Sequence, residues 1–109
     1  MKCLLIIPAY NEAENIEKVI ENIARNYTEY DYVIVNDGSR DNTEKICLRN
    51  GYHVLNLPIN IGIGGAVQTG YCYARDNDYD VAVQIDGDGQ HDVSFLAEMI
   101  KLIENGEAD

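Results

Sequence analysis

Basic residues are scarce in this sequence. Its 109 residues contain 8 Lys and Arg against 19 Asp and Glu, which gives a formal net charge of −11. So acidic a chain offers no basic stripe for the phosphate backbone of a nucleic acid, and no basic amphipathic helix for a membrane surface. We therefore expect neither a nucleic-acid-binding protein nor a basic peripheral membrane protein.

Long apolar runs are also missing. The longest, residues 3–7, ends at Pro8 and is too short for a membrane span or the core of a signal peptide. The three cysteines lie far apart and form no Cys-x-x-Cys pair, which argues against a disulfide framework or a zinc site. These absences favour a cytoplasmic protein with reduced cysteines, and the length fits one domain over residues 1–109.

The apolar residues that are present follow two alternating periods. Short runs rich in Val, Ile, Leu and Tyr predict buried strands at residues 4–7, 32–35, 54–57 and 81–85. Helical spacing predicts helices over residues 12–25, 41–50, 64–76 and 93–104. Asn11 and Glu14 resemble a capping box for the first helix, whose apolar face would hold Ile16, Val19, Ile20, Ile23 and Ala24.

Strict alternation of strands and helices predicts an α/β fold. Strands that are apolar on both faces indicate a mostly parallel sheet, with helices on both faces and right-handed crossovers. Ligands of such sheets bind beyond the carboxyl ends of the strands. The residues that follow each strand are therefore the candidates for function.

Three of the four predicted strands are followed by carboxylates. Glu12, Asp37 and the pair Asp86/Asp88 would face one crevice, and no G-x-G-x-x-G motif follows the first strand, which disfavours a dinucleotide-binding site. Asp37 also fits an ordinary turn former, and Asp41 fits a helix cap. The glycines at 62, 64 and 65 fit either a flexible helix entry or an anion site at a helix N-terminus.

The Asp86-Gly87-Asp88 turn is the most specific signal. Two carboxylates this close repel each other unless a cation lies beside them. With the amide oxygen of Gln90 they form a hard oxygen set suited to Mg²⁺ or Mn²⁺, although a solvated acidic turn is the alternative. Because residues 76–100 contain no Lys or Arg, a bound diphosphate would be neutralised mainly by a metal ion and backbone N–H groups.

Together these segments resemble family 2 glycosyltransferases of the GT-A fold, and especially the branch related to dolichyl-phosphate mannose synthase that transfers sugars to polyprenyl phosphates. The matching segments are residues 7–12 (IPAYNE) with 15–16, residues 35–39 (VNDGS) with Asp41 and Thr43, residues 60–70, and residues 84–91 (QIDGDGQH). They occur in the family's order and cover residues 4–99. One departure is Asn36, where many relatives have an aspartate.

The resemblance implies a nucleotide-sugar site in a Rossmann-like GT-A domain truncated after about the fourth strand and helix. By that resemblance, the donor would be a UDP- or GDP-sugar, the cofactor Mg²⁺ or Mn²⁺, and the acceptor a polyprenyl phosphate or a glycan, with inversion at the sugar carbon. The implied donor-binding residues are Pro8, Ala9, Tyr10, Glu12, Asp37, Gly62, Ile63, Gly64, Asp86, Gly87 and Asp88. The implied metal ligands are Asp86, Asp88 and Gln90, with Asp88 as the catalytic residue.

Relatives continue with another strand where this sequence stops at Asp109. We therefore expect a donor-binding half that transfers little sugar alone, tends to self-associate through a sheet edge, and works at the cytoplasmic membrane face within a longer protein. Two alternatives stay open. A phosphohydrolase of the haloacid-dehalogenase type would use Asp86 as nucleophile, and a non-catalytic module would bind nucleotide without turnover.

Overall fold

A computed structural model describes residues 2–85 of the chain. The predicted helix at residues 93–104 lies outside this range. The predicted donor and metal ligands Asp86, Gly87, Asp88 and Gln90 also lie outside it, and their roles therefore stay predictions.

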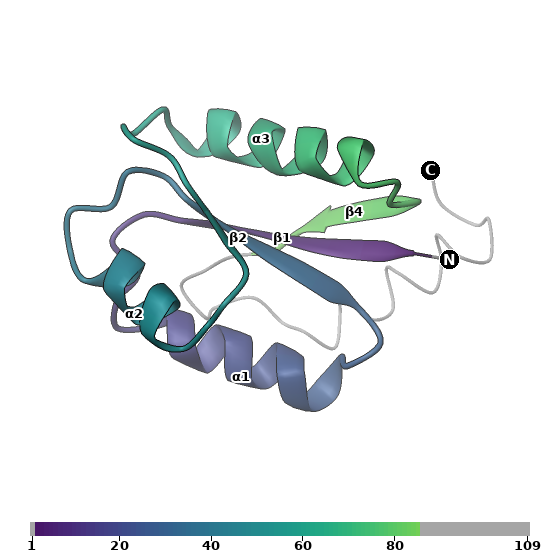
Figure 1. Cartoon of the computed structure of the whole chain (residues 1–109), viewed down its shortest axis with the longest axis horizontal. Coiled ribbons are helices and arrows are strands. Elements are labelled where there is room, and N and C mark those ends of the chain that lie inside the picture. Colours follow the sequence, from purple (N-terminus) through teal and green to yellow (C-terminus); the bar gives the residue numbers. More distant parts are fainter. Residues whose placement is uncertain (1, 86–109) are drawn as a thin grey trace.

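The described strands form one parallel sheet of four strands in the order β3-β2-β1-β4 (Figure 1). Strand β1 spans Cys3–Ala9, β2 spans Asp31–Asn36, β3 spans Val54–Asn56 and β4 spans Val81–Gln84. Strand β1 is central, with β2 on one side and β4 on the other. The four predicted strands and their parallel arrangement are confirmed.

Helices cover both faces of this sheet (Figure 1). Helices α1 (Ile16–Asn26) and α2 (Thr43–Arg49) lie on one face, and α3 (Ile63–Asp76) lies on the other. The chain moves outward from β1 to β3 and then returns through α3 to place β4 beside β1. The direction in which the chain adds strands thus reverses between the paired strands β1 and β4. Sheets of α/β proteins bind ligands beyond the carboxyl ends of the strands at such a point.

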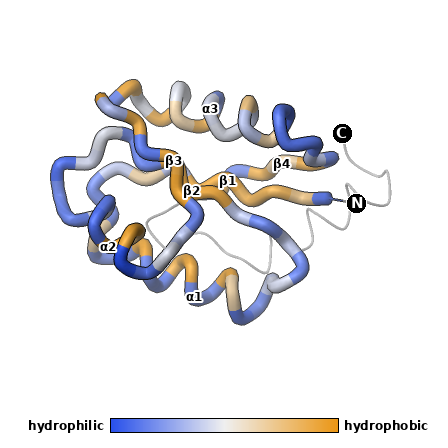
Figure 2. The backbone as a smooth tube through the Cα atoms, in the orientation of Figure 1, coloured by the Kyte–Doolittle hydropathy of each residue, from blue (hydrophilic) through white to orange (hydrophobic). Residues whose placement is uncertain are grey.

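The two faces are packed by side chains of different size. Helix α1 buries Ile16, Val19, Ile20 and Ile23 against Leu5, Ile7 and Ile34 of the sheet, and Figure 2 shows the alternation of apolar and polar residues along it. Helix α3 buries Ala66, Gly70 and Ala74 instead. A Cβ atom at Gly70 would lie 2.4 Å from Cγ2 of Ile6, so this helix packs so closely on β1 that only glycine fits there.

The start of α1 differs from the prediction. The helix begins at Ile16 rather than residue 12, and the capping box of Asn11 and Glu14 is wrong. Asn11 has a φ of 55°, in the left-handed region that asparagine tolerates, and its side-chain oxygen accepts a hydrogen bond from the backbone N–H of Arg40 at 2.9 Å. A contact with another loop therefore replaces the local cap. Ala24, expected on the apolar face, is exposed.

None of the helices within residues 2–85 combines the length and the apolar character that a membrane crossing requires.

Candidate functional site

Three loops follow β1, β2 and β3 at the same edge of the sheet, and we call them together the carboxyl rim: residues 10–15, 37–42 and 57–62. Polar side chains of one loop bind backbone groups of the next. The rim is therefore a connected structure rather than three independent turns.

Five hydrogen bonds join the first two loops and the residues that flank them, and three of the five run between the loops themselves. The backbone N–H of Asp37 donates to the carbonyl of Ala9 at 2.8 Å, where β1 and β2 end. Beyond them, Ser39 Oγ accepts from the N–H of Asn11 at 3.0 Å, and Thr43 Oγ1 accepts from the N–H of Glu12 at 3.0 Å. The remaining two bonds are Arg40 N–H to Asn11 Oδ1 and Ala13 N–H to Asp41 Oδ2.

Asn36, the last residue of β2, lies directly below the second loop of the rim and is 3% exposed. Its amide nitrogen donates to Asn56 Oδ1 at 2.9 Å, and its amide oxygen accepts from Ser39 Oγ. Its backbone carbonyl accepts the N–H of Leu57 at 2.9 Å. The Asn36 amide thus donates to one neighbour and accepts from another, whereas an aspartate there could accept from both only if Asn56 turned its own amide over.

Asp37 is a buried carboxylate, 3% exposed, held by the third loop. Its Oδ1 accepts from the backbone N–H of Ile61 at 2.8 Å, and its Oδ2 accepts from Asn60 Nδ2 at 3.1 Å. The same Nδ2 also donates to the backbone carbonyl of Asp37 at 3.0 Å. Asp37 therefore does more than shape its own turn, because it joins the second loop to the third.

Gly38 permits this close approach. Its φ is 67°, and a Cβ atom there would lie 2.5 Å from the backbone nitrogen of Asn60. Backbone atoms cannot move aside as a side chain can, so a glycine is required on both conformational and steric grounds.

Asp41 combines a capping role with a bridge to the first loop. Oδ1 accepts from the backbone N–H of Thr43 at 2.9 Å, at the start of α2, and Oδ2 accepts from the N–H of Ala13 at 3.2 Å. Partial burial on its own would raise the pKa of Asp41, but the hydrogen bonds from the Thr43 hydroxyl and from these backbone groups outweigh it and lower the pKa. The charged form of Asp41 is thus the one that the rim stabilises.

A cavity of about 330 Å³ opens beside Asn36. Polar groups of the second and third loops line it together with the first turn of α2. Its lining includes Asn36, Gly38, Ser39, Glu44, Asn56 and Pro58.

The predicted donor-loop residues lie at the beginning of α3. Gly62 precedes the helix with a φ of 90°, and Ile63 and Gly64 are its first two residues. The first turn of α3 contains no acidic residue, so its N-terminal dipole is not offset by a neighbouring carboxylate of that turn. The prediction of a helix entry at Gly64 is thus correct to within one residue.

The four predicted residues after the first strand divide into two pairs. Pro8 and Ala9 are the last residues of β1 and are buried. The carbonyl of Ala9 accepts the hydrogen bond from the backbone N–H of Asp37. Tyr10 is 43% exposed at the rim, and Glu12 is half-buried, with its side chain accepting from Asn15 Nδ2 at 3.2 Å. Tyr10 and Glu12 are the members of this segment whose side chains reach the surface.

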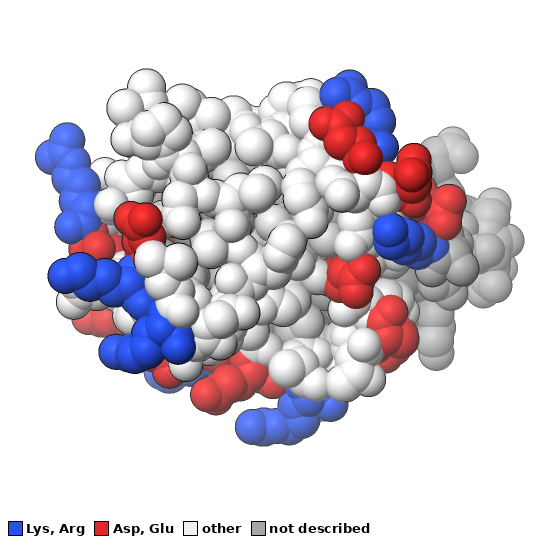
Figure 3. Space-filling model, in the orientation of Figure 1, with Lys and Arg blue, Asp and Glu red and all other residues white. Residues whose placement is uncertain are grey.

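The third loop is apolar on its outer side. Ile59 and Ile61 of this loop are 67% and 48% exposed, and Ile63 at the start of α3 is 64% exposed. Asn60, whose side chain binds Asp37, lies between the first two. Residues 50–74 contain no Asp, Glu, Lys or Arg. Figure 3 shows the consequence: charged side chains lie along the margins of this face and leave its centre uncharged.

The described part of the chain ends at Ile85, whose N–H donates to the carbonyl of Ile6 at 2.9 Å. The predicted metal ligands Asp86, Asp88 and Gln90 follow it in sequence and lie outside the described residues. Within residues 2–85, no group of three Asp, Glu, His or Cys side chains is arranged to hold a metal ion. The metal prediction thus depends wholly on residues after Ile85.

Sequence reasoning missed the residues that connect the rim. The sequence pattern marks Asn36 only as a departure from the family, and it assigns no role to Asn56 or Asn60. Their signal is positional: each asparagine lies at the end of a strand or in the loop that follows it, where an amide side chain can bind both a donor and an acceptor.

Comparison with known proteins places these observations in a family. The family model described as Glycosyl transferase family 2 matches residues 4–109. A UDP-N-acetylglucosamine–dolichyl-phosphate N-acetylglucosaminyltransferase of Methanococcus voltae is 37% identical over 93% of the chain and 47% of that protein. An undecaprenyl-phosphate mannosyltransferase of Micrococcus luteus is 30% identical over 98% of the chain and 46% of that protein.

A solved structure agrees with the family match. Glucosyl-3-phosphoglycerate synthase from Mycobacterium tuberculosis, in complex with Mn²⁺, UDP and glucosyl-3-phosphoglycerate, superposes with a TM-score of 0.63 at 26% identity. The match covers 79% of this chain and 33% of that one. The chain thus spans about half the length of the curated relatives named above.

Proposed function

The chain belongs to glycosyl transferase family 2 and has the GT-A fold, and from that premise we propose that it forms the donor-binding part of a glycosyltransferase. The reaction proposed is transfer of a sugar from a UDP- or GDP-sugar to a polyprenyl phosphate, with inversion at the sugar carbon. The family match over residues 4–109 favours this reaction over the phosphohydrolase alternative.

The observation that carries the proposal is the carboxyl rim. Its three loops follow neighbouring parallel strands and are joined by hydrogen bonds into one edge, next to the point where the strand order reverses between β1 and β4. This is the position at which α/β sheets bind nucleotides. Tyr10, Glu12 and Asp37 would line the base and ribose, with Pro8 and Ala9 shaping the floor below them.

The diphosphate of the donor would lie near the beginning of α3. Gly62, Ile63 and Gly64 bring the positive end of the helix dipole to the rim, and no acidic side chain opposes it in the first turn. Since residues 50–74 contain neither Lys nor Arg, backbone N–H groups are the positive groups that this segment can offer.

Asp86, Asp88 and Gln90 would hold Mg²⁺ or Mn²⁺. Their oxygen atoms are the ligand type that these ions prefer, and they follow Ile85, which is hydrogen-bonded to the central strand at the carboxyl edge. Bound there, the ion would neutralise charge that develops on the leaving nucleoside diphosphate. The solved relative named above was crystallised with Mn²⁺ and UDP, which supports this choice of ion.

The acceptor is proposed from the relatives. Both relatives named above act, by their names, on polyprenyl phosphates: dolichyl phosphate in one and undecaprenyl phosphate in the other. A glycan remains the alternative acceptor. Such a substrate would bring the protein to the cytoplasmic face of a membrane.

Calorimetric titration of the 109-residue chain with UDP and GDP tests the proposal. We expect binding with Mn²⁺ or Mg²⁺ and far weaker binding with a chelator. Asp88→Ala should remove most of the metal-dependent part of the binding free energy, about 2–4 kcal/mol, whereas Asp76→Ala, at the far end of α3, should not. Equal affinity with and without metal would contradict the metal site, and no binding of either nucleotide would contradict the donor site. A radiolabelled-donor assay then separates a transferase from a module that binds without turnover.

A further inference from the structure

The side chain of Asn60 occupies an unusual place in the rim. In the third loop, Asn60 lies between the exposed Ile59 and Ile61 and is itself exposed, but its Nδ2 lies 3.0 Å from the carbonyl of Asp37 and 3.1 Å from Oδ2. A single amide group thus binds both the backbone and the side chain of the acidic residue that the proposed function places at the base and ribose.

The Asp37 carboxylate, although only 3% exposed, has acceptor sites that the third loop does not use. An ionised carboxylate has about four acceptor sites on its two oxygens, and the third loop uses one on each: Ile61 N–H on Oδ1 and Asn60 on Oδ2. With both oxygens bound, the carboxylate cannot rotate without breaking a hydrogen bond. The remaining acceptor sites are therefore held in a defined direction.

The same contacts position the start of α3. Ile61 is followed by Gly62 and then by the first residue of the helix, so the bond between Ile61 N–H and Asp37 lies two residues from α3. The close approach of Gly38 to the backbone of Asn60 leaves little room for the loop to shift toward β2. Base recognition and diphosphate binding would thus depend on one anchored loop.

We propose that Asn60 is a positioning residue for nucleotide binding, which acts by clamping Asp37 and the start of α3 in one arrangement. The inference rests on the proposed function and deepens it, because it assigns a role to a residue that does not itself touch the nucleotide. It predicts that loss of the amide weakens binding through disorder of the loop and not through loss of a ligand contact.

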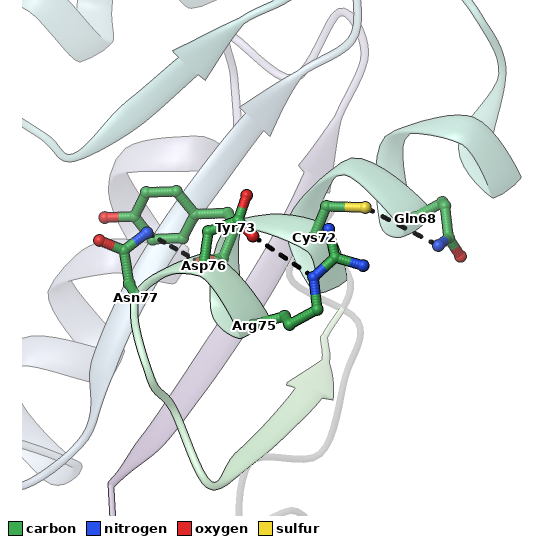
Figure 4. A network of polar contacts seen from close by, with 6 residues as sticks. All are labelled: Gln68, Cys72, Tyr73, Arg75, Asp76 and Asn77. Atoms are coloured by element: carbon green, nitrogen blue, oxygen red, sulfur yellow. Dashed lines mark hydrogen bonds and ion pairs between the residues drawn. The ribbon is translucent and has the colours of Figure 1, made fainter.

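The test uses the 109-residue chain and a matched control. Asn60→Ala removes the clamp. Asn77→Ala removes a comparable bond at the other end of α3, where Asn77 Nδ2 donates to the carbonyl of Tyr73 at 2.8 Å (Figure 4). Both asparagines are exposed, so neither substitution opens a cavity in the core.

Two measurements are compared. Amide hydrogen exchange at Ile61 reports its bond to Asp37 in the absence of any ligand, and calorimetry with UDP and GDP in the presence of Mn²⁺ reports binding. In Asn60→Ala we expect exchange at Ile61 to become about tenfold faster and the nucleotide Kd about tenfold weaker, the size of effect that loss of one hydrogen bond to a charged group produces. Asn77→Ala should change neither.

Asn60→Asp provides a readout that a merely structural residue would not show. At pH 7.5 its carboxylate faces that of Asp37 without a donor, and binding should be at least as weak as in Asn60→Ala. At pH 5, where one proton shared by the pair restores a hydrogen bond, affinity should partly recover. Glu12, Asp41 and Glu44 also lie at the rim, so the wild type and Asn60→Ala are measured at both pH values.

The outcomes separate the two proposals. If the wild type binds nucleotide and Asn60→Ala binds equally well with unchanged exchange at Ile61, the clamp is wrong while the donor site stands. If exchange at Ile61 rises and the Kd does not change, the loop is anchored by Asn60 but binding does not depend on it, which also overturns the positioning role. If the wild type binds neither nucleotide, the proposed function fails, and the role that rests on it fails too.

Discussion

The two ends of the sheet are closed by different chemistry. At the carboxyl rim, short side chains such as Asn11, Asn36, Asp37 and Ser39 bind backbone and side-chain groups of neighbouring loops. At the amino end, long and aromatic side chains close the edge around Lys2. The first arrangement fixes the positions of loops, whereas the second joins the beginnings of strands.

The amino end is built mainly on Lys2 and Tyr79. The backbone N–H of Lys2 donates to Asp80 Oδ2 at 2.8 Å, and its Nζ lies 4.3 Å from the centre of the Tyr79 ring. The Tyr79 hydroxyl donates to Asp31 Oδ2 at 2.7 Å, and Lys2 Nζ donates to the carbonyl of Asn77 at 3.0 Å. Because none of the proposed ligand residues lies here, changes at this end should affect stability and leave nucleotide binding intact.

The largest effect is expected for Asn36→Asp at the rim. The substitution places a second carboxylate beside Asp37 in a buried position, where the charge loses solvation and repels Asp37, at a cost of about 3 kcal/mol in the free energy of unfolding. Thermal and urea unfolding at pH 7 measure the loss. Asn77→Asp at the amino end is the control: it loses one exposed hydrogen bond and places a negative charge at the end of α3, and should cost about 1 kcal/mol or less. Equal stability of the two variants would contradict the account of the rim.

A smaller effect is expected for Tyr79→Phe at the amino end. Loss of the hydrogen bond to Asp31 should lower the free energy of unfolding by about 1 kcal/mol at pH 8, with nucleotide affinity unchanged. Tyr71→Phe, at a tyrosine of α3 that is 40% exposed, serves as the control. If Tyr79→Phe weakened nucleotide binding as much as Asn60→Ala does, the two ends of the sheet would not have separate roles.

Tyr79 should also make the stability of the protein depend on pH in the alkaline range. Burial, then the hydrogen bond and the negative charge of Asp31, raise the pKa of Tyr79 from 10.0 to about 12. A raised pKa means that the folded state holds the proton more tightly, so the contribution is complete below pH 10 and is lost as the pH rises from 10 to about 12. Tyr79→Phe should flatten the stability curve over that interval relative to Tyr71→Phe.

The smallest effect concerns acid sensitivity at the rim. Because the pKa of Asp41 is lowered from 3.8, its charged form favours folding, and this contribution is present above the unfolded value and lost as the pH falls through the folded value. In Asp41→Asn the fall in melting temperature between pH 6 and pH 3 should be smaller than in the wild type. Asp76→Asn, on the exposed end of α3, is the control for the many other carboxylates. Identical falls in Asp41→Asn and the wild type would show that the rim does not favour this charge.

The described strands and helices were predictable because their signals are local. Apolar runs of four or five residues marked each strand, and the helical spacing of Ile16, Val19, Ile20 and Ile23 marked the buried face of α1. These features depend on composition and spacing, which are visible in a linear sequence. The order of the strands in the sheet, with β4 beside β1, was not predicted.

The connections within the rim could not be predicted in the same way. Asn11 has the sequence context of a helix cap, but the neighbouring loop offers its side chain the N–H of Arg40, and the helix starts later as a result. The clamp of Asn60 on Asp37 joins residues 23 positions apart and exists only once β2 and β3 are paired. Contacts of this kind are products of the assembled sheet, and residue type alone does not disclose them.

The central position of β1 has a consequence for how the chain folds. Synthesis delivers β1 before the other described strands, yet its neighbour β4 is the last of them: Lys2 and Asp80, at the start of that pairing, are 78 positions apart. Both faces of β1 are buried in the finished sheet, so until β4 arrives an apolar strand has one open edge. Such non-local pairing slows folding and prolongs the time during which a nascent chain can associate wrongly. The central strand of the described sheet is thus also the one whose second edge stays unpaired longest during synthesis.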